Sequence, residues 1–269
     1  FYYSQVLGMD AGLVGLILLA ALLIDALVDP IIGYLSDRTY TRWGRRLPWL
    51  YTAPIPLAFM WILLWSPPGG EAPSTLGLLG IMVGIRLLLS ACEVPSISLV
   101  PEITSDYHER TTLFRFRFLS GWLGGIVMML LAYMVFMPGE NGLLDQSGYG
   151  PWGTVGAVLM AVAVLGSALG QHRIVAQLPE QKPAPFNVKD AFAEIIEAFS
   201  ERAFLFFAVG GLAAYISQGM NFSISNYLNV YVWQLDRVSF DWAPPWLNGL
   251  TAYPFALVVS VIAMFLIVA

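Results

Sequence analysis

Residues 25–49 of the chain read DALVDPIIGYLSDRTYTRWGRRLPW. The first half of this stretch is apolar apart from two aspartates, Asp25 and Asp29, and a serine, whereas the second half holds four arginines. An apolar run that ends in a short arginine-rich connection, with another apolar run directly after it, is typical of two membrane-spanning helices joined on the cytoplasmic side. The stretch therefore predicts a membrane protein with two carboxylates inside a spanning helix.

The composition of the whole chain favours a lipid environment. Hydrophobic residues make up 58% of the 269 residues and charged residues only 12%, against about 25% charged residues in soluble domains. A soluble domain of this length could not bury so much apolar surface. The net charge of −5 says little, but the lack of a basic face argues against nucleic acid as a partner, and the single cysteine, Cys92, excludes a disulfide framework. We expect no cofactor and no enzymatic activity, because the sequence shows no metal-ligand cluster, nucleophile elbow or phosphate-binding loop.

Seven windows of the sequence are long and apolar enough for a spanning helix, which needs about 20 apolar residues. They cover residues 11–35, 47–65, 75–100, 118–137, 152–171, 203–233 and 243–269. A polar segment, residues 173–202, separates the fifth window from the sixth and contains an amphipathic helical pattern at 187–202. The chain opens without a methionine and ends inside an apolar run, so we expect it to be part of a longer protein. The predicted fold is an all-α, polytopic membrane bundle.

The basic residues predict the orientation, because cytoplasmic connections of membrane proteins are enriched in Lys and Arg. One set of connections holds 11 of the 13 basic residues. They are Arg38, Arg42, Arg45, Arg46, Arg110, Arg115, Arg117, Arg173, Lys182, Lys189 and Arg202. The opposite set holds only Arg237, and Arg86 lies within a span. The first set is therefore predicted to face the cytoplasm, in a multi-pass protein surrounded by the lipid of a bacterial-type inner membrane.

Four ionisable residues lie inside predicted spans: Asp25, Asp29, Arg86 and Glu93. Each costs about 2.5–3.5 kcal/mol at the centre of a helix, so each requires a partner or a function. Asp25 and Asp29 stand four residues apart, so their carboxylates emerge from one helix face and repel each other unless a cation, a proton or an arginine intervenes. A Na⁺ or H⁺ site needs this arrangement. The alternative is a pair neutralised by an arginine that only joins helices.

Further polar residues lie at comparable depth. Glu93 shares a helix face with Ser90, and Arg86 lies two turns away from Glu93 on the same face. Arg86 can pair with Glu93, with Asp25 or with a solute, and a plain salt bridge between helices is an equally good interpretation. In the sixth window, a polar stripe suits either a hydroxyl-rich solute or hydrogen bonds between helices. The stripe consists of Gln218, Asn221, Ser225 and Asn229.

Two motifs resemble those of a known transporter family. The first resembles the cytoplasmic loop signature of the major facilitator superfamily, in a form stretched by several residues. Its residues are Gly33, Asp37, Arg38, Gly44, Arg45 and Arg46. This stretched form, with Asp-x-x-x-Asp-Pro before it, is similar to that of the glycoside–pentoside–hexuronide:cation symporter family. The second motif, EVPSISLVPEITSDYHERTTLFRFRF at residues 93–118, resembles the fourth helix and following loop of the same family.

The resemblance implies a secondary transporter of about 12 helices in two six-helix halves, working as a monomer. Residues 1–172 would form the first half, with most of its first helix missing. Residues 173–202 would form the cytoplasmic link, and residues 203–269 the start of the second half. The chain would then hold about seven complete spanning helices of the expected total.

The resemblance also implies roles for individual residues. Asp25, Asp29 and Ser90 would form a cation site for Na⁺ or H⁺. Glu93 and Arg117 would bind the solute, and the polar pattern adds Arg86, Gln218 and Asn221 as candidates. The loop residues Gly33, Asp37, Arg38, Arg45 and Arg46 would form a cytoplasmic gate.

Three positions depart from the family pattern. Val28 replaces an amide ligand, which weakens the case for Na⁺ and leaves H⁺ open. Leu22 replaces an arginine, for which Arg86 is a candidate substitute. Ile97 or Ser98 stands where an aromatic residue would stack on sugar. We expect cation-coupled symport of a sugar or glycoside, and two alternatives stay open: a lipid-like or amphiphilic solute, and a non-transporting membrane subunit with the same fold.

Overall fold

The computed structural model describes residues 1–138, 142–176, 200–228, 232–234, 255 and 259. The chain divides into two compact units, one formed by Phe1–Glu180 with Ser239–Ala269 and the other by Gln181–Val238. The first unit contains the helices α1 (Ala11–Asp37), α2 (Leu47–Thr52), α3 (Pro54–Trp65), α4 (Thr75–Ile103), α5 (Tyr107–Leu131) and α6 (Tyr149–Val175). Short helical turns also occur, among them η1 (Tyr2–Val6) and η3 (Ala132–Phe136), which continues α5. The second unit contains α8 (Arg202–Tyr227).

Polar side chains fix where three of the long helices begin. Asp10 accepts a hydrogen bond from the backbone N–H of Leu13 before α1, and Asp106 accepts one from Glu109 before α5. Ser74 does the same for Gly77 at the start of α4. Such caps satisfy backbone donors that have no partner within the helix. The helix starts are therefore encoded locally, in the connections between the apolar runs.

The first six predicted spans are confirmed as helices within the described residues, which exclude residues 229–231 of the sixth span, and two corrections are needed. The second span is divided into α2 and α3, because Pro54 has no N–H to donate to the carbonyl of Leu50. The fourth span begins at Tyr107 rather than at residue 118. The sequence predicts Arg110, Arg115 and Arg117 in a connection, and this is wrong, because all three lie inside α5. The seventh span, apart from residues 255 and 259, and most of the amphipathic segment at 187–202 lie outside the described residues.

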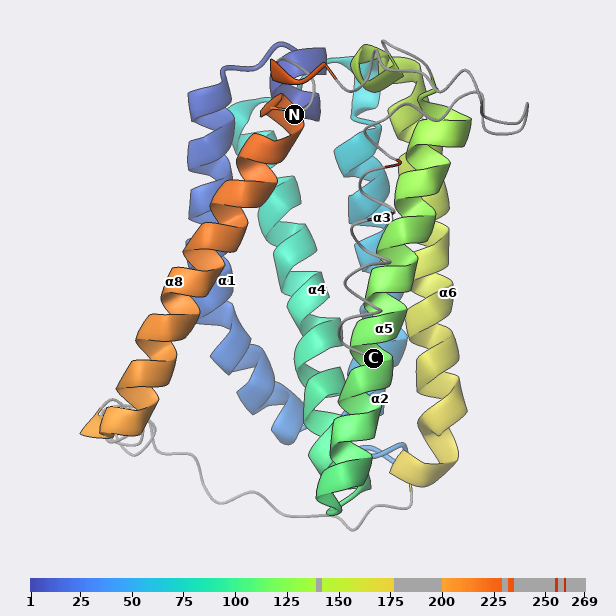
Figure 1. Ribbon diagram of the computed structural model, residues 1–269. Helices are drawn as coiled ribbons and strands as arrows, with labels where there is room; N and C mark the ends of the chain where they lie inside the picture. Colours follow the sequence, from blue (N-terminus) through green and yellow to red (C-terminus); the bar gives the residue numbers. More distant parts are fainter. Residues whose placement is uncertain (139–141, 177–199, 229–231, 235–254, 256–258, 260–269) are drawn as a thin grey trace. The chain divides into compact units, whose positions relative to one another are not determined.

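In the first unit the chain reverses direction between α1 and α2, between α3 and α4, between α4 and α5, and between α5 and α6, while α2 and α3 follow one another along the same path (Figure 1). The α1 helix packs along α4, and α3 packs against both α4 and α6. Leu47, Leu57, Leu78 and Leu99 are almost completely buried at these contacts. Many other large apolar side chains on the same helices stay exposed, as expected where lipid is the solvent. Five helical stretches within the described residues are long and apolar enough to cross a membrane.

An aromatic cluster joins η1 to α3 and α6 at the end of the first unit that we predict to face outward. The hydroxyl of Tyr3 donates to the carbonyl of Leu64 at 2.7 Å, and the Trp65 ring stacks on Tyr149 with centroids 5.8 Å apart. A Cβ atom added to Gly153 on α6 would lie 2.5 Å from the Cβ of Trp65. The close approach of α3 and α6 therefore depends on a glycine at this position.

Substituting Gly153→Ala should lower the stability of the full-length protein. The added methyl group meets Trp65, and overpacking of this kind typically costs about 1–3 kcal/mol. Thermal unfolding in detergent measures the effect. The matched control is Gly166→Ala on the same helix, where an added Cβ meets no atom within 4 Å in the described part of the chain. Equal melting temperatures for the two variants would contradict this packing.

Candidate cation and solute sites

Asp25 is held by two side chains from the neighbouring helix. Ser90 Oγ donates to Asp25 Oδ1 at 3.0 Å, and Arg86 Nη1 lies 3.4 Å from Asp25 Oδ2. Because Arg86 and Ser90 are four residues apart on α4, they share one face of this helix, which packs along α1. Only 16% of the Asp25 side chain is exposed. Of the possible partners for Arg86, the structure therefore shows Asp25.

Asp29 lies one turn further along α1 and differs from Asp25 in its hydrogen bonding. Its Oδ1 is buried and has no hydrogen-bond partner among the described residues. A buried carboxylate oxygen without a donor is unfavourable, and a proton, a cation or a water molecule would each satisfy it. Pro30 directly follows it inside α1 and cannot donate to the carbonyl of Ala26, which gives this turn a further available oxygen. The oxygens here are hard ligands, which suit Na⁺ or H⁺.

Glu93 and Arg117 form a second polar group, between α4 and α5. Arg117 Nη2 lies 3.8 Å from Glu93 Oε1, and Arg117 Nη1 donates to Ser96 Oγ at 2.6 Å. The Glu93 side chain is 54% exposed, far more than that of Asp25. A carboxylate and a guanidinium that keep free hydrogen-bonding positions are suited to a hydroxylated solute. The structure thus brings these two candidates together and separates their contacts from those of Asp25.

Gln218 and Asn221 lie on α8 in the second unit, and both are exposed there. Asn221 Oδ1 accepts a hydrogen bond from Ser225 Oγ at 2.7 Å. The polar stripe predicted from the sequence thus includes an internal hydrogen bond along the helix. Asn229, its last member, is outside the described residues. The role of Gln218 and Asn221 in solute binding stays a prediction.

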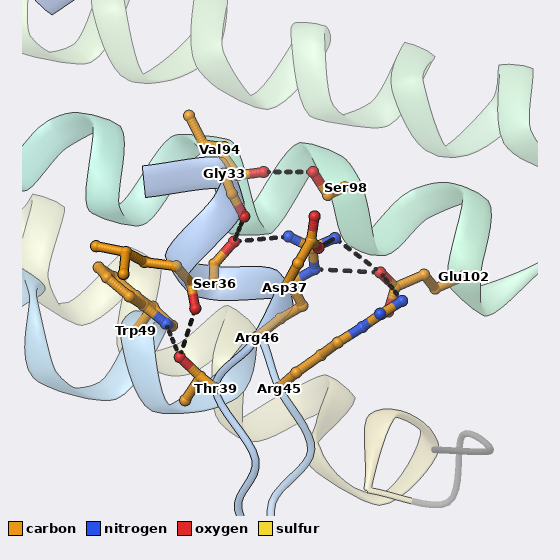
Figure 2. A network of polar contacts seen from close by, with 11 residues as sticks. Gly33, Ser36, Asp37, Thr39, Arg45, Arg46, Trp49, Val94, Ser98 and Glu102 are labelled. Carbon is orange, nitrogen blue, oxygen red and sulfur yellow. Dashed lines mark hydrogen bonds and ion pairs between the residues drawn. The ribbon is translucent and has the colours of Figure 1, made fainter. Parts of the chain in front are cut away.

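The loop motif forms a network that we call the inner charge cluster: Ser36, Asp37, Arg45, Arg46 and Glu102 (Figure 2). One oxygen of Glu102 accepts hydrogen bonds from Arg45 at 2.9 Å and from Arg46 at 3.1 Å. Arg46 also forms an ion pair with Asp37 and donates to Ser36 Oγ at 2.7 Å. The Arg46 side chain is only 7% exposed, so its positive charge depends on these partners.

The other two predicted gate residues, Gly33 and Arg38, lie beside this cluster and make other contacts. The Gly33 carbonyl accepts a hydrogen bond from Ser36 Oγ at 2.9 Å. Arg38 lies over the ring of Tyr34, 4.0 Å from its centroid, and donates to the hydroxyl of that tyrosine. Sequence reasoning did not assign Ser36 or Glu102. The signal for Glu102 was its place just after Pro101, within the second family motif and at the inner end of α4.

A sequence profile of the family described as MFS/sugar transport protein matches residues 1–267 of the chain. The chain belongs to this family. The resemblance of its loop motifs to the glycoside–pentoside–hexuronide:cation symporter family agrees with relatives that are named as symporters. An uncharacterized symporter of Synechocystis sp. is 34% identical over 213 residues, which cover 75% of this chain and 39% of the relative.

Two further relatives are similar over shorter stretches. The isoprimeverose transporter of Lactiplantibacillus pentosus is 31% identical over 167 residues, covering 61% of this chain and 34% of the relative. The inner membrane symporter YicJ of Escherichia coli is 30% identical over 151 residues, covering 55% of this chain and 33% of the relative. The chain thus spans between a third and two-fifths of the length of these curated relatives. Together with the apolar helices, the family identifies a multi-pass membrane protein of a transporter family.

Neutralising Glu102 by Glu102→Gln should destabilise the inner charge cluster. Arg45 and Arg46 would both lose a carboxylate, and loss of one partner of a buried charged group typically costs about 1–3 kcal/mol. The measurement is thermal unfolding of the full-length protein in detergent.

The matched control for this variant is Glu71→Gln, which removes the same charge at an exposed position in the connection before α4. It should leave the melting temperature unchanged within error. A fall of equal size in both variants would mean that net charge, and not the cluster, determines the effect.

Proposed function

We propose that this chain is part of a secondary active transporter that couples a cation, Na⁺ or H⁺, to the symport of a sugar or glycoside. The observation that carries this proposal is the contrast between Asp25 and Asp29. One carboxylate is satisfied by Arg86 and Ser90, and the other has a buried oxygen without a donor in the described residues. An ionisable group held in this condition inside a membrane is typical of an ion pathway.

Coupling follows from the charge of this site. Asp25 lies one turn from Asp29 and is contacted by Ser90. A cation or proton at Asp29 would reduce the repulsion between the carboxylates of Asp25 and Asp29. If the solute-binding arrangement of the helices has the higher affinity for the ion, ion and solute must raise each other's affinity by the same factor. A coupling energy of about 1–3 kcal/mol is typical of such linkage.

The solute would bind near the middle of the membrane, as is typical of secondary transporters. Glu93 and Arg117 would supply a carboxylate and a guanidinium, and Gln218 and Asn221 on α8 are the candidates for amide contacts. All four side chains can exchange hydrogen bonds with hydroxyl groups. One relative is named as an isoprimeverose transporter, which supports a sugar or glycoside as the solute.

The inner charge cluster would act as the cytoplasmic gate. Its members come from α1, from the connection after α1 and from the inner end of α4. Breaking their ion pairs would allow these elements to separate when the site opens to the cytoplasm, and reforming them would close it. We place the protein in a bacterial-type inner membrane, acting as a monomer with no cofactor besides the coupling ion.

A second candidate cargo is an amphiphilic molecule. Ile97 or Ser98 stands where a sugar-stacking aromatic would be expected, and the Ile97 side chain is 40% exposed. An exposed apolar residue beside Glu93 suits a solute with both a polar and an apolar part. Equilibrium binding of sugars and of lysolipids to the full-length protein separates the two cargoes.

Asp29→Asn should abolish ion-driven accumulation of solute. Asparagine cannot carry the negative charge that a cation or proton neutralises, so the gradient loses its point of action. The measurement is uptake of isoprimeverose and of a panel of simple sugars into proteoliposomes of the full-length protein, with imposed Na⁺ and H⁺ gradients. Wild-type uptake should rise with one of the gradients, and the variant should lose at least about tenfold of this stimulation, equivalent to 1.4 kcal/mol.

The matched control is Asp10→Asn, at the exposed N-cap of the same helix, where asparagine caps as well as aspartate. It should retain gradient-driven uptake. If neither gradient stimulates the wild-type protein, symport is rejected in favour of a non-transporting membrane subunit.

A further inference from the structure

Arg86 places a permanent positive charge inside the membrane beside the candidate cation site. It lies within α4, and its side chain reaches Asp25 on α1. Arginine stays protonated under all conditions a protein meets, so this charge cannot be removed by a change in pH. Any mobile cation that approaches Asp25 therefore meets a fixed cation that is already in contact with the carboxylate.

Both oxygens of Asp25 are engaged by α4. Arg86 contacts Oδ2, and Ser90, which is 7% exposed, donates to Oδ1. A hydroxyl that donates its proton to a carboxylate presents that proton, and not a lone pair, toward the acid. In this arrangement Asp25 and Ser90 satisfy each other, and neither offers the open set of oxygen ligands that a metal cation requires.

The charge balance at the site points the same way. With both carboxylates ionised, Asp25 and Asp29 contribute two negative charges, and Arg86 contributes one positive charge. A single negative charge therefore remains, and the oxygen without a donor in the described residues belongs to Asp29. Removal of the guanidinium would leave two carboxylates one turn apart, with ligands from both free to share one cation.

We propose that Arg86 is a specificity-determining residue, a tethered cation that occupies Asp25 and excludes Na⁺ from the carboxylate pair. The inference deepens the proposed function, on which it rests for the role of this pair in coupling. In the wild-type protein the Asp25 carboxylate is already paired with Arg86, and the guanidinium repels Na⁺. In a variant without the guanidinium, the same two carboxylates form a Na⁺ site.

The test is Na⁺-dependent thermal stabilisation of the full-length protein in detergent, with NaCl compared against choline chloride at equal ionic strength. A ligand that binds the folded state raises the melting temperature. The wild-type protein should unfold at the same temperature in both salts. Arg86→Gln should unfold at a lower temperature in choline chloride and gain about 2–4 °C from NaCl.

Three further variants make the test specific. Arg86→Lys keeps the charge and should not respond to Na⁺. Arg86→Met is a second neutral variant of similar length, which serves if the glutamine variant does not fold. The double variant Arg86→Gln/Asp25→Asn should lose the response again, because the freed carboxylate is the new ligand.

Three results would overturn the proposal: stabilisation of the wild-type protein by NaCl, the absence of a response in both neutral variants, or an equal response in Arg86→Lys. The melting experiment requires no transport. A protein that fails gradient-driven uptake but gains Na⁺ binding on loss of Arg86 would refute symport and retain the role of Arg86. Gradient-driven uptake by the wild-type protein, without a gain of Na⁺ binding in the neutral Arg86 variants, would support symport and refute the role of Arg86.

Discussion

A charged side chain inside a membrane must find a partner, and this constraint organises the first unit of the protein. The α4 helix supplies the partners at two levels. Arg86 and Ser90 hold Asp25 of α1, and Glu102, at the inner end of α4, holds the arginines that follow α1. Apolar packing between these helices is non-directional, so the polar contacts are what fix their register and rotation. The same two helices thus carry both the candidate ion site and the candidate gate.

This shared scaffold gives a physical route between the two sites. Asp29 and Asp37 lie on the same helix, α1, two turns apart. If a cation or proton binds at Asp29 as proposed, the change of charge acts on α1, and Arg46 links α1 to α4 because it contacts Asp37 and Glu102 at once. An ion bound in the membrane can therefore favour or oppose closure of the inner charge cluster without any contact between the ion and the cluster.

The sequence was sufficient for those features that depend on local pattern. Apolar runs predicted the spans, and spacing of four predicted that Asp25 and Asp29 share a face. The partner of Arg86 could not be predicted, because it depends on how α1 and α4 are rotated about their axes. Glu102 was missed because its arginine partners are 56 and 57 residues away in the sequence. The first turns of α5 were read as a connection because they are polar, although the Asp106 cap marks the true start.

The interpretation of Asp25 as part of a simple staple between helices explains only half of the geometry. An ion pair that merely joins two helices is rarely better than well-packed apolar residues of similar size. Asp25 with Arg86 fits that description, but Asp29 does not, since its buried oxygen has no donor in the described part of the chain. A buried Asp29 oxygen without a donor, one turn from the paired Asp25, destabilises the fold and does not hold the helices together. The arrangement is accounted for when the fixed cation serves one carboxylate and a mobile one serves the other.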